Sequence, residues 1–153
     1  MQCLSILTII WYNRGMSAKD RIHDAVKNSL IKDGWTITHD PYKIKYGDDQ
    51  VYVDLAAERT IAAERSGSRI LVEVKSFTGS STLHDLKIAV GQFIMYRSVL
   101  DELGVEDKLY IAVSDDVYAN DFNRDMVKLV INRNEIPLLV VALDSEEVIE
   151  WTR

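Results

Sequence analysis

The sequence predicts a single mixed α/β domain, in which a central mixed β-sheet is flanked by helices. The chain has 153 residues, a length typical of one domain, and its 47% of hydrophobic residues can form a substantial core. Apolar residues recur at helical spacing in some segments and alternate as in strands in others. No linker or internal repeat separates these segments, so we expect one domain over residues 16–153.

Residues 1–15 stand apart from that domain. Their apolar run, residues 2–12, is shorter than the ~20 residues that span a membrane. It also lacks the basic start and the small-residue cleavage site of a secretory signal. Ser17 is followed three residues later by Asp20, a spacing typical of a helix start. We therefore expect the domain to begin near Met16, and residues 1–15 to be either an upstream extension or an extra strand.

The first half of the domain is predicted to be a helix followed by antiparallel strands. Residues 18–33 place Ile22, Val26 and Leu30 on one helical face, and Gly34 is typical of a helix end. Asp40-Pro41 breaks the first strand, and the short segment 66–68 predicts a tight hairpin. The predicted strands cover residues 35–39, 43–46, 51–57, 61–65 and 69–77.

The second half is predicted to alternate helices with strands. A long helix over residues 83–103 ends before Gly104, and a short strand follows over residues 109–113. Asn120 or Asp121 can cap a third helix that extends to about residue 134. Residues 136–143 form a continuous apolar run, the pattern of a strand that is covered on both faces.

The net charge of -6 is unevenly distributed along the chain. Residues 1–97 carry a balance of +2 and residues 98–153 a balance of -8. The first part can approach a polyanion, whereas the last third would repel one and is better suited to a protein partner. A strong non-specific DNA-binding protein is excluded. The single cysteine, Cys3, permits no internal disulfide, so we expect a cytoplasmic protein.

The residues that carry chemistry are Asp54, Glu73 and Lys75. Glu73 and Lys75 lie within an otherwise apolar strand, where alternation places both on one face and Val72 and Val74 on the other. Burial of a carboxylate and an ammonium requires compensation. Asp54 likewise interrupts an apolar strand, which the intervening hairpin can bring alongside. Two carboxylates and a lysine on one patch predict a site for Mg²⁺ or Mn²⁺.

Such a site suits the hydrolysis of a phosphodiester. A carboxylate-held cation offsets the negative charge that builds on the phosphoryl oxygens and lowers the pKa of a bound water. Lysine can orient that water or stabilise the transition state. The competing interpretation is a partly buried Glu73–Lys75 ion pair in which each charge only compensates the other.

The three histidines lack the spacing of a metal site and are expected to be structural or exposed: His23, His39 and His84.

The pattern Asp54…Glu73-Val-Lys75, between an N-terminal helix and a long helix, resembles the PD-(D/E)XK restriction-endonuclease-like superfamily. From Met16 onward the chain more closely resembles the fdxN-element excision controlling factor family (XisH-type). The segments that carry this likeness are residues 18–20, 23–28, 30–42, 61–65, 72–77 and 138–141. The resemblance covers nearly all of residues 16–152 and implies a restriction-endonuclease-like core.

This family resemblance also implies roles for single residues. Asp54 and Glu73 would hold Mg²⁺, with the backbone carbonyl of Val74 as a third ligand, and Lys75 would be the catalytic lysine. The proline that usually precedes the aspartate is replaced by Val53.

Residues on the two helices extend the candidate site. Asp24 lies roughly where many members of the superfamily carry an acidic residue on the first helix, with a solvated helix-face charge as the alternative. Gln92 and Tyr96 lie four residues apart, so they share one face of the predicted helix. Their spacing resembles the Gln-x-x-x-Tyr motif of RecB-like and phage exonucleases. The glutamine would hold a bound water or a phosphate, and the tyrosine would contact the substrate. The alternative is a tyrosine at the edge of the core beside a polar glutamine.

The resemblance implies a DNA partner and a role in the excision of a DNA element during cell differentiation. It also implies a separate site-specific recombinase and an XisI-type partner protein. A homodimer is a separate expectation, which the resemblance does not supply. Three hypotheses stay open: a Mg²⁺-dependent nuclease, a catalytically silent accessory factor that binds DNA or its partner, and one half of a toxin–antitoxin-like pair.

Overall fold

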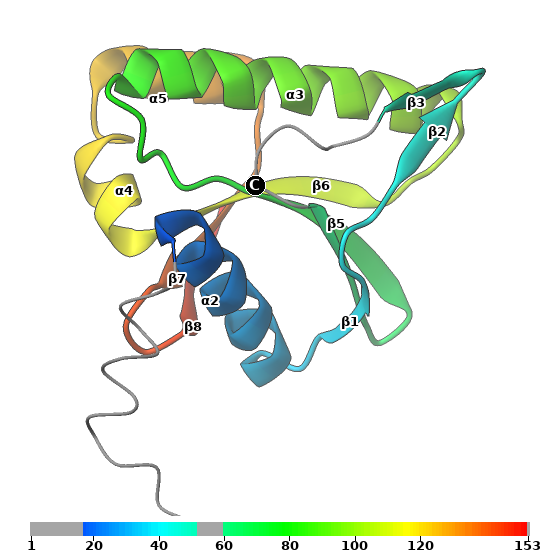
Figure 1. The fold of residues 1–153 in the computed structure, drawn as a ribbon, viewed down its shortest axis with the longest axis horizontal. Helices are drawn as coiled ribbons and strands as arrows, with labels where there is room; N and C mark the ends of the chain where they lie inside the picture. The colour runs from blue at the N-terminus through cyan, green and yellow to red at the C-terminus, as the bar shows by residue number, and fades with distance from the viewer. Residues whose placement is uncertain (1–16, 52–59, 153) are drawn as a thin grey trace, which may run out of the picture.

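A computed structural model describes residues 17–51 and 60–152 and confirms the mixed α/β prediction. Its main sheet has six strands in the order β1-β4-β5-β6-β7-β8 (Figure 1). The central pairs β5–β6 and β6–β7 are parallel, and the outer pairs are antiparallel. The strands are β1 (Thr36–His39), β4 (Thr60–Arg65), β5 (Ser68–Val74), β6 (Lys108–Ser114), β7 (Leu138–Ala142) and β8 (Glu147–Trp151).

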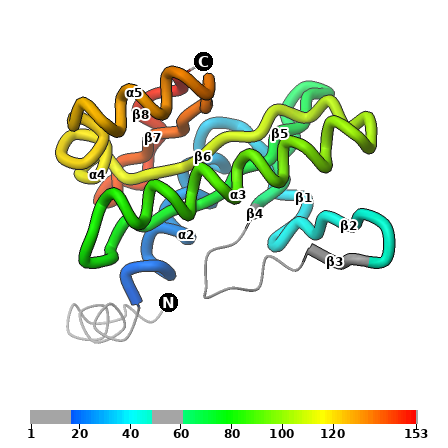
Figure 2. The backbone as a smooth tube through the Cα atoms, turned by 90° about the horizontal axis from the view of Figure 1, so that it is seen from above, coloured from blue at the N-terminus to red at the C-terminus, as the bar shows by residue number. Residues whose placement is uncertain are grey.

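Helices cover both faces of this sheet (Figure 1). The helix α2 (Ala18–Lys32) packs on one face, whereas α3 (Thr82–Glu102) and α5 (Asp125–Arg133) both lie over the other (Figure 1 and Figure 2). The short helix α4 (Asp115–Asn120) follows β6 directly. A separate two-stranded sheet, β2 (Ile44–Tyr46) and β3 (Asp49–Val51), projects toward one end of α3.

The first helix has the ends that the sequence predicts. The hydroxyl of Ser17 accepts a hydrogen bond from the backbone N–H of Asp20 at 3.1 Å and caps α2. At the other end Gly34 has a φ of 88°, a conformation that a residue with a Cβ rarely adopts. The face of α2 that carries Val26 and Leu30 is fully buried, as the helical spacing predicts.

The sheet separates two hydrophobic layers. Toward α3 and α5, residues such as Leu71, Ile111 and Val140 form one layer. Toward α2, the alternate positions of the same strands form the other layer, which includes Val72 and Leu139. Both faces of β7 are therefore covered, in agreement with the prediction from its continuous apolar run.

The helix predicted from Asn120 or Asp121 to about residue 134 is present as α5, but its predicted start is wrong, because α5 begins at Asp125. The hydroxyl of Ser114 accepts a hydrogen bond from the N–H of Val117 and caps α4, which therefore begins before either predicted cap. Asp121 ends α4 as its C-cap, and α5 begins only at Asp125.

The turn between α4 and α5 is held by an aromatic contact. Phe122 is buried there, and its ring lies 5.1 Å from that of Phe77, measured between the ring centroids. Because Phe77 follows β5, this contact depends on the tertiary structure. It stabilises a break that local composition does not predict.

The sequence did not predict the edge strand β8. Its outward residues are charged, with Glu147 and Glu150 exposed, and its alternation is incomplete because Ile149 is also exposed. Pairing with β7 and the contact between the rings of Trp151 and Tyr110, whose centroids lie 4.9 Å apart, hold it on the sheet.

Some predictions fall outside the described residues. Of the strand predicted over residues 51–57, only its first residue is described, as the end of β3. Asp54 and residues 1–15 lie outside the described part of the chain. Among the helices of residues 17–51 and 60–152, none is long and apolar enough to cross a membrane.

Candidate functional site

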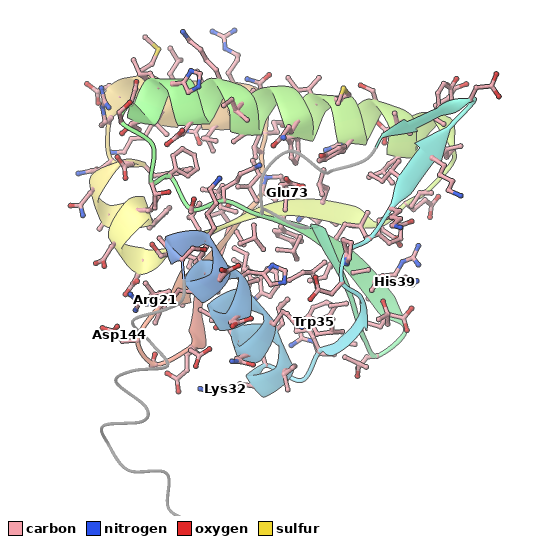
Figure 3. The ribbon with its side chains drawn as sticks, viewed as in Figure 1. Arg21, Lys32, Trp35, His39, Glu73 and Asp144 are labelled. Atoms are coloured by element: carbon pink, nitrogen blue, oxygen red, sulfur yellow. The ribbon has the colours of Figure 1, made fainter. Side chains whose placement is uncertain are left out.

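The candidate site lies in the middle of the sheet, on the face that α3 covers. Glu73 sits on β5 between Thr60 of β4 and Ile111 of β6, and it is 0% exposed. Lys75, two residues later, is 5% exposed and shares this face, whereas Val72 and Val74 pack toward α2. Figure 3 shows Glu73 in the layer between the sheet and α3. The alternation predicted from the sequence is therefore confirmed.

Glu73, Lys75 and Gln92 form one connected polar group. The Nζ of Lys75 lies 3.1 Å from Oε1 of Glu73, and it also donates a hydrogen bond to Oε1 of Gln92 on α3. The backbone N–H of Lys75 donates to the carbonyl of Ala112 at 2.9 Å, which continues the pairing with β6 past the end of β5. Strand and helix together fix the position of the ammonium group.

Burial of the Glu73–Lys75 ion pair carries a large desolvation cost. Removal of two charges from water is unfavourable, and their attraction compensates only when the geometry is good and the remaining polar atoms are satisfied. The amide of Gln92 supplies one such acceptor. The group therefore holds a lysine cation at a fixed point beside a carboxylate, which is an arrangement able to orient an anion or a water molecule.

Tyr96 lies one helical turn after Gln92, and the structure places it in the core. It is 2% exposed and belongs to the layer beneath α3. Burial raises the pKa of the Tyr96 phenol, and the negative charge of Glu73 raises it further. The phenol is thus held neutral near the carboxylate. A direct contact between Tyr96 and substrate would require this layer to open.

The predicted metal ligands are only partly described. Glu73 provides a buried carboxylate and Val74 a backbone carbonyl, and both are the hard oxygen donors that Mg²⁺ prefers. Asp54, the second predicted carboxylate, lies outside the described residues. Within residues 17–51 and 60–152, no group of three or more His, Cys, Asp or Glu side chains is arranged to hold a metal ion. The donor chemistry of Glu73 and Val74 fits Mg²⁺, but this pair alone does not make a complete site.

The structure does not bring Asp24 to this group. Asp24 is exposed on α2, and α2 packs against the opposite face of the sheet from Glu73. Its position agrees with the alternative that the sequence left open, a solvated charge on a helix face.

A second polar cluster, which the sequence analysis missed, joins α2 to the end of β1. Oδ2 of Asp40 lies 3.0 Å from Nε2 of His23 and 2.9 Å from Nζ of Lys27. Burial alone would raise the pKa of Asp40, but the hydrogen bonds and positive charges of Lys27 and His23 outweigh it and hold that pKa below its usual range. The spacing of His23 and Lys27 on one helix face was the available signal, although no sequence pattern links them to Asp40.

Comparison with known proteins identifies the family. The family model described as "XisH protein" matches residues 16–149 of this chain. The chain belongs to the XisH family. This confirms the resemblance that the sequence segments carry. A search of curated proteins found no match.

Two solved structures of XisH-type proteins have the same fold. A crystal structure of an XisH family protein from Nostoc punctiforme is 38% identical, covers 88% of this chain and 100% of its own, and has a TM-score of 0.80. A crystal structure described as an fdxN element excision controlling factor protein from Anabaena variabilis is also 38% identical, with coverage of 88% and 99% and a TM-score of 0.79. The similarity extends over nearly the whole described domain.

Proposed function

We propose that this XisH-family chain is a metal-dependent nuclease-fold protein that acts on DNA and serves as a controlling factor in the excision of a DNA element. The observation that carries the proposal is the buried Glu73–Lys75 pair, which Gln92 holds from α3. A protein that only binds its partners has no evident need for these charges inside its sheet. The similarity to the Anabaena variabilis excision controlling factor supports the excision role.

As a nuclease, the chain would position a phosphodiester of DNA and the water that attacks it. Lys75 provides a fixed cation that orients the water or offsets the charge on a phosphoryl oxygen, and Gln92 keeps the ammonium group in place. Glu73, the carbonyl of Val74 and Asp54 would hold Mg²⁺ or Mn²⁺, which when bound supplies Lewis-acid stabilisation and a more acidic water. Tyr96 lies in the core near Glu73, whose negative charge raises the pKa of its phenol.

We propose further that the protein works with a separate site-specific recombinase and an XisI-type partner protein, as the family resemblance implies. The acidic balance of residues 98–153 supports this division of labour. DNA would approach the first part of the chain, and a protein partner would contact the last third.

One observation favours a second candidate, a catalytically silent accessory factor. Glu73 is 0% exposed and Lys75 is 5% exposed, so the pair is closed to solvent. An active nuclease must admit a phosphate to this position, whereas a silent factor can keep the pair as an internal structural element. The two candidates therefore differ in whether α3 moves away from the strand end when DNA and metal bind.

A cleavage assay tests the proposal. Plasmid and linear DNA are incubated with Mg²⁺ or Mn²⁺ and the wild type, Glu73→Gln or Lys75→Met, each with and without the XisI-type partner. We expect metal-dependent cleavage by the wild type and a loss of about 100-fold or more in each variant, since both charges act on the reacting phosphate. Linear and circular products distinguish exonuclease from endonuclease action.

A matched control separates chemistry from folding. Leu30→Ala changes the opposite layer and leaves the Glu73–Lys75–Gln92 group intact, so it should retain cleavage at a temperature where it is folded. Circular dichroism establishes which variants are folded. If folded wild type leaves DNA intact with both metals, alone and with the partner, the accessory-factor hypothesis replaces the nuclease.

A further inference from the structure

The outer face of α3 presents an ordered stripe that packs against no element of the described chain. From His84 to Glu102, exposed residues on this face recur at alternating intervals of four and three positions, which is the spacing of a coiled-coil seam. Ile88 and Met95 on this stripe are 45% and 49% exposed, and the neighbouring Ile94 is 47% exposed. The stripe consists of His84, Ile88, Gly91, Met95, Ser98 and Glu102, all of them exposed.

Gly91 lies at the centre of the stripe, and no neighbour in the described part of the chain requires a glycine at this position. A Cβ added there would meet no atom within 4 Å, and Gly91 has an ordinary helical φ. Glycine weakens a helix interior relative to alanine, because it loses more backbone freedom on folding. A small residue between the exposed apolar side chains of Ile88 and Met95 is what close approach by another helix requires.

The stripe is complementary to an antiparallel copy of itself. With a two-fold axis that crosses the middle of α3, Met95 of one copy faces Gly91 of the other, and Ile88 faces Ser98. Each large side chain thus meets a small one, as in interdigitated helix packing. Ser98 already donates its hydroxyl to the carbonyl of Ile94 at 2.7 Å, so burial would not leave that group unpaired.

The charges on α3 obey the same symmetry. The first part of the helix carries His84, Asp85 and Lys87, and its later turns carry Arg97, Asp101 and Glu102. Within one copy, Nε of Arg97 lies 3.6 Å from Oδ2 of Asp101, and both side chains are exposed. In the antiparallel arrangement Lys87 lies opposite Asp101 of the second copy, and His84 lies opposite Glu102. A parallel arrangement would instead bring like charges together. The pairs Lys87–Asp101 and His84–Glu102 therefore favour an isologous two-fold contact, in which Asp101 would lie between Arg97 of its own helix and Lys87 of the second copy.

We propose that the chain forms a homodimer in which the α3 helices of two copies pack antiparallel across Gly91. The seam runs along most of the 21-residue helix, which is about 30 Å long at ~1.5 Å per residue. Gln92 lies on the flank of the same helix, so the two copies would hold their Glu73–Lys75–Gln92 groups on either side of one two-fold axis. The dimer itself does not depend on the chemistry of those groups.

Analytical ultracentrifugation of the full chain over a concentration series tests the inference. We expect wild type to self-associate and Gly91→Arg to be monomeric, because a long charged side chain would occupy the space of Met95 from the second copy. Leu129→Arg is the matched control: Leu129 is 56% exposed on α5, outside the stripe, and the substitution should leave association unchanged. Circular dichroism verifies that both variants are folded.

A charge exchange checks the register. Lys87→Glu and Asp101→Lys should each weaken the dimer about tenfold, since each creates two like-charge pairs per dimer. The double variant should regain wild-type association. A wild type that stays monomeric, a dimer that Gly91→Arg leaves unchanged, or a double variant no better than the single ones would overturn the proposal. DNA cleavage by a monomeric wild type would leave the proposed function standing, so the two proposals can fail separately.

Discussion

The two faces of the central sheet contain polar groups of very different kinds. On the α3 face, Glu73 and Lys75 are buried within the layer and held by strand and helix. On the α2 face the layer is apolar apart from the buried hydroxyl of Ser29, and the polar cluster of His23, Lys27 and Asp40 lies where the helix meets the end of β1. Lys27 and Asp40 remain partly exposed, with side-chain exposures of 33% and 14%.

The comparison indicates which polar group needs its partner most. Exposed and partly exposed ion pairs contribute little to stability, whereas a charge deep in a sheet is tolerated only with its partner in place. The cluster of His23, Lys27 and Asp40 fastens a helix to a strand without burying a full charge pair. The Glu73–Lys75 pair is instead buried at the centre of the sheet, where each charge depends on the other whether the pair is catalytic or structural.

The largest effect is expected from Lys75→Met. This change leaves the Glu73 carboxylate buried without its ammonium partner, and it should lower the free energy of unfolding by about 3–5 kcal/mol. Urea denaturation followed by circular dichroism measures the change. The double variant Glu73→Gln with Lys75→Met removes both charges at similar volume, and it should be more stable than Lys75→Met alone. If Lys75→Met and the double variant lose the same free energy of unfolding, the Glu73 carboxylate does not depend on its ammonium partner, and the prediction is wrong.

An intermediate effect is expected from Leu30→Ala on the α2 face. Leu30 is 0% exposed, and its truncation leaves a cavity that should reduce the free energy of unfolding by about 3 kcal/mol. Leu100→Ala on α3 is the matched change in the other layer, where the side chain is 2% exposed. The two faces should respond alike to this apolar change in urea denaturation. A loss confined to one face would show that the layers are not equally well packed.

The smallest effect is expected from Asp40→Asn, and it should depend on pH. The pKa of Asp40 is lower in the folded protein than the unfolded value of about 3.9. The folded state therefore gains stability from the ionised carboxylate above about pH 4, and this gain is lost as the pH falls through the folded pKa. At neutral pH the substitution should cost roughly 1 kcal/mol, because solvent screens this partly exposed cluster.

Thermal denaturation of the wild type and Asp40→Asn between neutral and acidic pH measures that contribution. The difference between the two proteins should shrink as the pH falls below about 4. Lys27→Met serves as the partner control, since it removes one of the two groups that lower the pKa of Asp40. A difference that stays constant over the whole pH range would mean that Asp40 does not act through its charge.

Much of the fold could be predicted from local pattern alone. The capped helix α2, the long helix α3 and the buried strand β7 each carry a strong periodic signal, and the structure has all three. The helix predicted from Asn120 or Asp121 starts later than expected, at Asp125, because Asn120 and Asp121 end the short helix α4 instead and Phe122 is buried between the two helices. The strand β8 was not predicted because its apolar and charged residues do not alternate regularly: Ile149 and Glu150 are adjacent and both exposed.

The sequence by itself determined the mixed α/β class, the shared face of Glu73 and Lys75, and the family. These follow from alternation along one strand and from residue identity, which need no knowledge of distant contacts. Only the tertiary structure decided that Gln92 holds the ammonium of Lys75, that Tyr96 lies in the core, and that His23 joins Asp40. The two polar contacts each join residues 17 positions apart, and chain packing alone brings them together.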